Sequence, residues 1–382
     1  MKLLDLVESL RASPAATDKL LKAFVDANTF PLVEGDTATF FFWDGEPTKG
    51  VNLMHWVFGL ETRQPFTRIL GTDAFYLSLE LPHRARVEYK FELLRGGRRR
   101  WIRDPRNDLQ AFDPFGSNSV CPMPGYEEPN WIHPAENCRR GRIESFTLKS
   151  AEWGDEREVT MYLPNEYKPH KRYPLLLCHD GRDYRRFANM VDVLDALIHR
   201  REVRPLVVAF VDGVDRNREY GANPRQTVFL VDELLPAVRA RYGVTKDPAE
   251  TGVMGASFGA VSSLFAHWQR PDVFGKLLLQ SGSFVFTDVG HHGRSELFDP
   301  VVEFVNALRN DTGKLEGRTH LSCGVFESLI QFNRALLPLL RERGMDVRYS
   351  EAQDGHNWIA WRDRLRDGLT WLYPGHLWMW YD

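Results

Sequence analysis

The stretch that decides the fold is residues 251–270, TGVMGASFGAVSSLFAHWQR. It begins with a short apolar run, passes through Gly255, Ser257 and Gly259 in the pattern Gly-x-Ser-x-Gly, and continues as a helical pattern. A strand, this pattern and then a helix predict a nucleophile elbow, a turn so sharp that the positions two residues either side of the serine favour glycine. The alternative is a serine in an ordinary glycine-rich turn. Because the pattern lies between a strand and a helix, Ser257 is the predicted nucleophile.

The region around the elbow alternates between strand-like and helical segments. From about residue 141, a hairpin pattern is followed by unbroken apolar runs, among them YPLLLCHDG at 173–181, RPLVVAFVDG at 204–213 and GKLLLQSGS at 275–283. Unbroken apolar runs are typical of strands buried on both faces, and helical patterns separate them here. This alternation predicts a doubly wound, mostly parallel sheet, an α/β-hydrolase fold, over residues 141–382.

The chain before residue 141 has a different character. Residues 1–29 form an amphipathic helical pattern, and residues 30–140 contain short aromatic and β-branched runs such as ATFFFWDG at 38–45, separated by turn signals. Short strands at this spacing predict an all-β sandwich, which ends in a proline-rich linker. At the other end, the aromatic tail YPGHLWMWYD at 373–382 is expected to pack on the catalytic domain or between subunits, and an oligomer is compatible with the sequence.

Composition narrows the classes of partner and compartment. The 382 residues are 43% hydrophobic with a formal net charge of −3, which gives no reason to expect nucleic acid or an anionic membrane as a partner. No apolar run has membrane-spanning length, and charges interrupt the N-terminal segment where a signal peptide would be apolar, so we expect a cytoplasmic protein. The four cysteines are scattered without CxxC spacing, so we expect no zinc site and a reducing compartment. We also expect no other metal and no cofactor.

A serine nucleophile needs a base and an acid, which follow it in the order acid, then histidine, in this fold. His356 lies just after the last strand-like run, in EAQDGHNWIAW, and is the predicted base. Glu327 follows the apolar run THLSCGVF, where this fold delivers its acid. Asp354 is the alternative acid, although a carboxylate only two residues from the histidine is awkwardly placed to orient the imidazole. We favour Glu327.

The remaining predicted site residues lie on loops at the ends of strands. The backbone N–H of Phe258 follows the nucleophile and is one predicted oxyanion donor. The other is expected within the loop after LLLCHDG, at Gly181 or Arg182, although DGRDY could equally be a solvated turn. Asp180 and Trp358 are also predicted to bind substrate.

Several dispersed motifs, in order, resemble the enterochelin esterase branch of the esterase D-like α/β hydrolases. They are the run VVAFVDGVDRNREYGANPRQTVFLVDELLPAVRARYG, the elbow GASFGA, LLLQSGSF, GVFESLIQFNRALLPLL and DGHNWIAWRDRLRDGLTWL, while ATFFFWDG, LGTDAFYLSLELP, VEYKF and DPRNDLQ are similar to that family's immunoglobulin-like N-terminal module. The resemblance implies ester hydrolysis without a metal, with Ser257 as nucleophile, His356 as base and Glu327 as the candidate acid. Arg218, in RNREY, matches a family arginine near the active site.

The resemblance also implies a substrate, the trilactone of a catecholate siderophore, whose cleavage releases iron. A ferric catecholate is anionic and would favour the cationic loops that carry Arg182, Arg185, Arg186, Arg216, Arg218 and Arg225. The chain departs from the family pattern at Tyr220, where leucine is common, and tyrosine is found there in relatives that cleave feruloyl or acetyl esters. The alternative is therefore a carbohydrate-linked esterase, with a sandwich that binds sugar through Trp43, Trp56 or Trp101.

Overall fold

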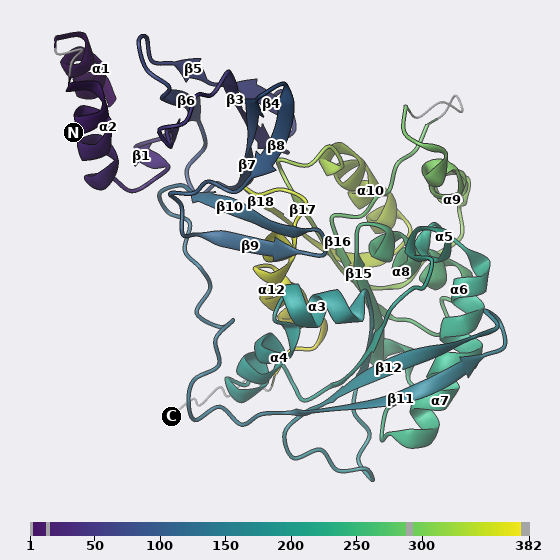
Figure 1. Cartoon of the computed structure of the whole chain (residues 1–382). Coiled ribbons are helices and arrows are strands. Elements are labelled where there is room, and N and C mark those ends of the chain that lie inside the picture. Colours follow the sequence, from purple (N-terminus) through teal and green to yellow (C-terminus); the bar gives the residue numbers. More distant parts are fainter. Residues whose placement is uncertain (1–2, 13–15, 288–292, 376–382) are drawn as a thin grey trace, which may run out of the picture. The chain divides into compact units, whose positions relative to one another are not determined.

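The computed structural model describes residues 3–12, 16–287 and 293–375 (Figure 1). Its contacts divide the chain into two compact units. The first, which we call the sandwich unit, contains residues 1–128 together with the short segments 325–327 and 352–356. The second, the α/β unit, contains residues 129–324, 328–351 and 357–382. The two short segments therefore belong with the N-terminal part of the chain, although they interrupt the α/β unit in sequence.

The sandwich unit consists of two antiparallel sheets and two helices. One sheet has the strand order β1-β2-β6-β5, and the other has the order β4-β3-β7-β10-β9, with β8 paired to β7. The elements are α1 (Leu3–Ala12), α2 (Thr17–Asp26), β1 (Leu32–Glu34), β2 (Thr37–Phe42), β3 (Gly50–His55), β4 (Arg63–Pro65), β5 (Thr67–Arg68), β6 (Phe75–Glu80), β7 (Arg86–Arg95), β8 (Arg98–Ile102), β9 (Gln110–Asp113) and β10 (Gly116–Pro122). This confirms the predicted all-β module.

The aromatic run in β2 explains why helices α1 and α2 lie on this sheet. Successive side chains of a strand point to opposite faces. Phe40 and Phe42 lie in the core between the two sheets, whereas Phe41 packs with Phe24 and Leu21 of α2. A sheet with apolar side chains on both faces needs a cover on each, and the amphipathic helices cover the outer one.

The α/β unit is built on one eight-stranded sheet in the order β11-β12-β14-β13-β15-β16-β17-β18. The strands are β11 (Arg142–Ser150), β12 (Asp155–Leu163), β13 (Leu175–His179), β14 (Val207–Val211), β15 (Thr251–Ala256), β16 (Lys276–Gln280), β17 (Gly317–Gly324) and β18 (Met345–Ala352). Strands β11 and β12 form the predicted hairpin, β12 is antiparallel to β14, and the pairs from β14 through β13, β15 and β16 to β17 are parallel. The mostly parallel sheet confirms the α/β-hydrolase fold.

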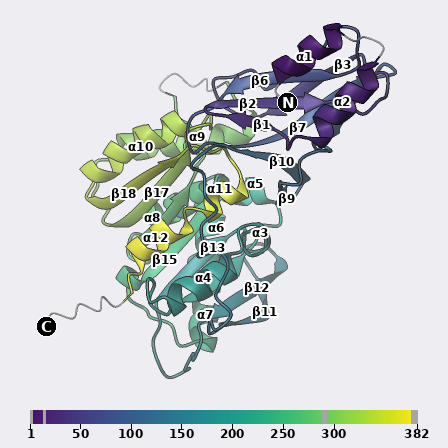
Figure 2. The same ribbon diagram turned by 90° about the vertical axis from the view of Figure 1, so that its left-hand side faces the viewer.

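Helices cover both faces of this sheet (Figure 2). Leu175 and Leu177 of β13 join the cluster that contains α7, α8, α9 and α10, whereas Leu176 and Cys178 join the cluster that contains α3, α4, α11 and α12. The bounds are α3 (Gly181–Phe187), α4 (Met190–His199), α5 (Arg216–Tyr220), α6 (Pro224–Val228), the π-helix η2 (Phe229–Leu234), α7 (Leu235–Arg241), the 3₁₀ helix η3 (Pro248–Glu250), α8 (Phe258–Gln269), the 3₁₀ helix η4 (Glu296–Phe298), α9 (Asp299–Asn310), α10 (Ile330–Glu342), α11 (Trp358–Arg362) and α12 (Leu365–Leu372). Burial on both faces explains the unbroken apolar runs.

Two further features concern the chain as a whole. Among the described residues, no helix is both long enough and apolar enough to cross a membrane. All four cysteines are buried and free of disulfide bonds. In the aromatic tail, Tyr373 is fully buried and its hydroxyl donates to the backbone oxygen of Leu175, whereas residues 376–382 lie outside the described part of the chain.

Candidate active site

The elbow forms where β15 ends and α8 begins. Ser257 lies between them with φ 57° and ψ −120°, a backbone conformation that L-residues rarely adopt and that costs free energy. A Cβ atom at Gly255 would overlap the backbone of Gly259, so the turn has no room for a side chain there. At Gly259 the nearest atoms to such a Cβ would be 3.3 Å away, on His179 and Asp180. The strained serine between close-packed glycines is the geometry that the sequence pattern predicts.

Hydrogen bonds hold the elbow to the neighbouring strand end. The Ser257 N–H donates to the backbone oxygen of Gln280 at 2.9 Å, and the Ser283 N–H donates to the backbone oxygen of Ser257 at 3.3 Å. The hydroxyls of Ser257 and Ser283 lie 3.1 Å apart. Ser257 remains partly exposed, so its hydroxyl is held in place yet accessible. Ser283 lies in the run GKLLLQSGS, but nothing in that pattern singles it out as a neighbour of the nucleophile.

The predicted oxyanion loop follows β13 directly. Asp180 has a left-handed backbone with φ 53°, and α3 begins at Gly181. The backbone N–H groups of Gly181 and Phe258 are the first of their helices, where the helix itself supplies no acceptor. In contrast, the Arg182 N–H donates to the carboxylate of Asp212 at 3.1 Å. Gly181 and Phe258 are thus better placed than Arg182 to donate to a substrate oxygen.

Asp180 and Arg216, both predicted to bind substrate, are paired with each other. The Arg216 guanidinium donates to the two carboxylate oxygens of Asp180 at 2.6 and 2.7 Å, a bidentate arrangement. It also donates to the backbone oxygen of Ala256, the last residue of β15, at 3.4 Å. The pair therefore braces the ends of β13 and β15, next to the nucleophile.

His179 lies directly behind this loop as a neutral imidazole. It is fully buried, its ring is 4.6 Å from that of Tyr220, and neither ring nitrogen has a hydrogen-bond partner among the described residues. Burial, followed by the charge of Arg216, lowers the pKa of His179 to about 3. The histidine thus stays uncharged at neutral pH and packs as an apolar ring under the elbow.

The other predicted binding residues fall into two groups. Trp358 is buried, with its ring centroid 5.2 Å from that of Tyr184 and 4.7 Å from that of Trp361, so it belongs to the aromatic core beneath the site. Arg182 and Arg218 are exposed, and neither side chain has a hydrogen bond or ion pair within the described part of the chain.

The remaining arginines of the cationic loops already have partners. Arg225 pairs with Glu152 at 2.6 Å and lies 4.4 Å from the centre of the Trp153 ring. The Arg185 side chain donates to the backbone oxygen of Gly181 at 3.3 Å, and Arg186 lies over the Phe187 ring. These arginines keep their positive charge, but their side chains are held by contacts within the protein.

The predicted base and acid lie together in the sandwich unit. Nδ1 of His356 is 2.7 Å from Oε2 of Glu327. The Glu327 side chain is 1% exposed and that of His356 is 37% exposed, so the carboxylate is shielded while the imidazole stays accessible. Asp354, the alternative acid, instead lies 3.2 Å from the guanidinium of Arg86. Of the two candidates, Glu327 is therefore the one that can orient the imidazole.

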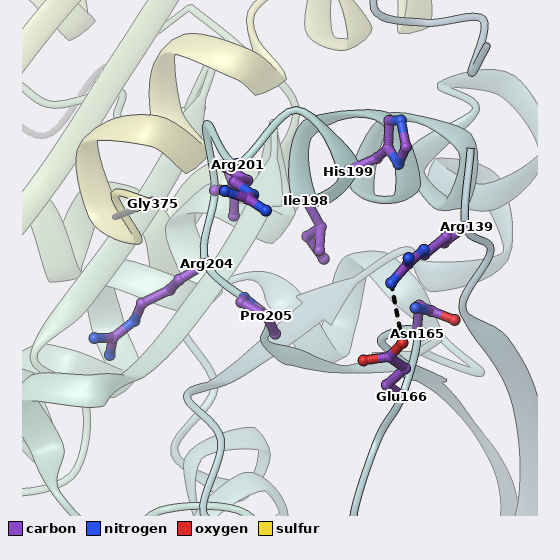
Figure 3. A pocket seen from close by; sticks show the side chains of 10 residues that line it. Arg139, Asn165, Glu166, Ile198, His199, Arg201, Arg204, Pro205 and Gly375 are labelled. Carbon is purple, nitrogen blue, oxygen red and sulfur yellow. Dashed lines mark hydrogen bonds and ion pairs between the residues drawn. The ribbon is translucent and has the colours of Figure 1, made fainter. Parts of the chain in front are cut away.

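A separate cavity of about 430 Å³ lies at the opposite edge of the sheet (Figure 3). Val203, Arg204 and Pro205, which precede β14, form part of its wall, so it lies at the amino end of the parallel strands, whereas Ser257 follows the carboxyl end of β15. Figure 3 shows the ion pair between Arg139 and Glu166 across one side. Within residues 3–12, 16–287 and 293–375, no group of three or more histidine, cysteine or acidic side chains is arranged to hold a metal ion.

Comparisons with known proteins relate this chain to esterases. The family model described as "Putative esterase" matches residues 150–372. The iron(III) enterobactin esterase of Escherichia coli O6:H1 is 28% identical over 336 residues, which cover 80% of this chain and 81% of the relative. The ferric enterobactin esterase structure from Salmonella typhimurium has a TM-score of 0.77 at 25% identity, covering 92% of this chain and 98% of that one. A xylanase/feruloyl esterase of Xylanibacter ruminicola is 24% identical, over 55% of this chain and 31% of its own.

Proposed function

The chain belongs to the Esterase family and is a carboxylic ester hydrolase, and we propose that its substrate is the trilactone backbone of a catecholate siderophore of the enterobactin type. The extent of the similarity carries this proposal. The enterobactin esterases match along both the sandwich unit and the α/β unit, with 80% and 92% of this chain covered, whereas the feruloyl esterase match covers 55%. We also propose the cytoplasm as the place of reaction, because all four cysteines are buried and none forms a disulfide.

We further propose a triad of Ser257, His356 and Glu327. His356 accepts the proton of the Ser257 hydroxyl through Nε2, because Glu327 occupies Nδ1. The serine oxygen attacks the ester carbonyl, and the N–H groups of Phe258 and Gly181 stabilise the oxyanion. His356 then returns the proton to the leaving alcohol, and a water that it activates hydrolyses the acyl-enzyme.

The strand order supports this assembly. Strands β15, β16 and β17 are parallel, so their carboxyl ends meet at one edge of the sheet. Ser257 follows β15, and Glu327 comes three residues after the end of β17. His356 comes shortly after β18, which the helix α10 connects to β17 as a parallel crossover requires.

The charge of the loops supports an anionic substrate. Arg182 follows the predicted oxyanion donor Gly181, and Arg218 lies on α5, whose first residue is tied to Asp180. Both side chains are exposed, and neither has a hydrogen bond or ion pair within the described residues. A catecholate complex supplies the negative charge that such cations attract.

Exposed aromatic side chains of the sandwich unit favour an aromatic substrate. Trp56 and Phe58 are 48% and 49% exposed, on the loop after β3. The Phe58 N–H donates to the backbone oxygen of Phe326 at 2.8 Å, and Phe326 directly precedes Glu327. Exposed aromatic side chains beside a catalytic carboxylate suit stacking on a dihydroxybenzoyl ring.

The test is a hydrolysis assay with ferric and iron-free enterobactin, in which the linear products are separated by chromatography. We expect the wild-type protein to produce dihydroxybenzoyl-serine from at least one of them and Ser257→Ala to produce none. An aryl ester such as 4-nitrophenyl butyrate serves as control. Cleavage of the aryl ester with both siderophores left intact would disprove the proposed substrate but would leave the esterase activity established.

One observation favours a second candidate, a feruloyl esterase that binds carbohydrate. Trp56 and Trp101 are both half-exposed and lie edge to face with ring centroids 6.5 Å apart, as in a platform that could stack on sugar. Both are among the tryptophans that the sequence offers as candidate sugar-binding residues. Release of ferulate from a feruloylated arabinoxylan oligosaccharide, with no siderophore hydrolysis, would establish this alternative.

A further inference from the structure

The loop that carries His356 is held by a buried arginine of the sandwich unit. We propose that Arg86, the first residue of β7, is a positioning residue that sets the orientation of His356 through its ion pair with Asp354. The inference rests on the proposed function only in taking His356 and Glu327 as the base and acid. It gives the sandwich unit a part in the reaction step itself, beyond any contact with substrate.

The contacts of Arg86 converge on the residues just before His356. Its side chain is 3% exposed and lies 3.2 Å from Asp354 and 2.8 Å from Glu88. Its backbone N–H donates to the oxygen of Gln353 at 2.9 Å. Burial would lower the pKa of Arg86, but the two carboxylates raise it above its usual value, so the guanidinium stays charged. Side chain and backbone of one residue thus both bind the histidine loop.

Asp354 passes this constraint on to the catalytic pair. Its carboxylate accepts from the Gly355 N–H at 2.7 Å, which fixes the residue next to His356. Its backbone oxygen accepts from the Phe326 N–H at 3.1 Å, which ties the histidine loop to the residue before Glu327. One carboxylate residue therefore joins both loops that supply the 2.7 Å contact between His356 and Glu327.

The acid loop is held by the same unit through apolar packing. The Phe326 side chain is buried in the cluster between the two sheets of the sandwich, which includes Phe91 of β7 and Val57. The Phe58 N–H donates to the Phe326 backbone oxygen at 2.8 Å. The residues before Glu327 and before His356 are thus both anchored in the sandwich unit, one by packing and the other by charge.

Stability alone does not account well for a buried ion pair at this position. Desolvation offsets much of the Coulomb attraction, so well-packed apolar residues often serve stability equally well. What a charged partner held between two carboxylates supplies is geometry, and a misplacement of about 1 Å can cost about 10²-fold in rate. The position of the pair, two residues from the proposed base, is where such geometry matters.

The experiment compares Arg86→Met, Arg86→Lys, Asp354→Asn and the double variant Arg86→Met/Asp354→Asn in the full chain, with 4-nitrophenyl butyrate as substrate. We expect Arg86→Met to lower kcat about 10- to 100-fold with KM within about twofold, because positioning acts on the reaction step. Arg86→Lys should recover part of kcat. The double variant should lose no more than Arg86→Met, since both changes remove one interaction.

The matched control is Arg343→Met. Arg343 is likewise a buried arginine, paired with Asp311 at 2.7 Å, and lies just before β18, at the opposite end of that strand from His356. Activities are compared at a temperature at which circular dichroism shows every variant folded. A kcat within twofold of wild type in Arg86→Met, or an equal loss in Arg343→Met, would overturn the inference. If Arg86→Met does not fold, the isosteric Asp354→Asn tests the inference instead. We then expect kcat to fall about three- to tenfold, and an unchanged kcat would contradict the inference. If Ser257→Ala is inactive and Arg86→Met is fully active, only this inference is wrong. If Ser257→Ala is active, the proposed function itself is wrong.

Discussion

The two parts of the proposed triad are held by different physical means. Ser257 is held by backbone geometry, in a strained turn between β15 and α8 that is closed by Gly255 and Gly259. His356 and Glu327 are held by side chains of the sandwich unit, with Arg86 bound to Asp354 across 268 positions of sequence. The comparison teaches that one active site can combine a locally encoded nucleophile with an acid–base pair that depends on distant residues.

The difference should also appear in how each part responds to change. Because backbone geometry positions Ser257, its position should be insensitive to changes on the surface but sensitive to a side chain added at Gly255. Because side chains position His356, its orientation should depend on each of the charged residues that hold its loop. The following tests challenge these two expectations, beginning with the largest effect.

Replacement of the nucleophile is expected to have the largest effect. Ser257→Ala should lower kcat by about 10⁴–10⁶-fold, because no other group can form the acyl-enzyme. Labelling by a fluorophosphonate probe should disappear with it. The matched control is Ser283→Ala, whose hydroxyl lies 3.1 Å from that of Ser257 and which should still be labelled. Labelling that persists in Ser257→Ala, or is lost only in Ser283→Ala, would contradict the nucleophile assignment.

Replacement of the acid should come next. Glu327→Gln is expected to lower kcat by about 10²–10⁴-fold, since an amide neither fixes the imidazole tautomer nor stabilises the imidazolium. Asp354→Asn, an equivalent change in the carboxylate bound to Arg86, should cost about tenfold or less. Steady-state kinetics on an aryl ester measures both. The reverse order of losses would make Asp354 the acid.

Acid should lower the stability of the α/β unit more than that of the sandwich unit. Burial lowers the pKa of His179 to about 3 and of His267 and His320 to about 4, all in the α/β unit. Below pH 6.5 the unfolded chain binds these protons more readily than the folded one, so each histidine removes up to about 1.4 kcal/mol of stability per pH unit until its folded pKa is reached. In the sandwich unit, burial likewise lowers the pKa of His55, but it raises the pKa of Asp104 to about 6, and protonation of that carboxyl adds stability as pH falls from 6 to 4.

Hydrogen exchange measured peptide by peptide between pH 7 and 5, corrected for the intrinsic rate, resolves the two units. Amides of β13, β15 and α8 should lose protection while those of β7 and β10 keep it. His267→Gln, which removes one titrating group from the α/β unit, should weaken the dependence there. Equal loss of protection in both units would contradict the expectation.

The smallest expected effect distinguishes the two elbow glycines. Gly255→Ala should lower the free energy of unfolding by about 1–3 kcal/mol, because the added methyl group meets the backbone of Gly259, which cannot move aside. Gly259→Ala should cost less, since its nearest neighbours at 3.3 Å include the end of a side chain. Urea denaturation followed by circular dichroism measures both, and equal costs would show that the turn is less tightly closed than described.

Three features could be predicted from the sequence, because each depends on residues close together in the chain. They are the elbow, the alternating strands and helices of the α/β unit, and the β-sandwich. A Gly-x-Ser-x-Gly turn needs only its neighbours, and buried parallel strands appear as unbroken apolar runs. The predicted enterochelin esterase resemblance, confirmed by the comparisons, rests on the same dispersed local motifs. These features depend on residues close together in the chain.

What only the tertiary structure decided is which polar side chains meet. Nothing in the sequence indicates that Asp180 is matched by Arg216, or that Arg86 reaches Asp354 while Glu327 takes His356. Nor does local pattern show that Trp358 is buried whereas Trp56 is exposed. Ion pairs and burial are set by which elements pack together, and a charged residue looks the same in sequence whether its partner lies four or 268 positions away. The nucleophile could therefore be read from one short stretch, while the partners that orient its base required the fold.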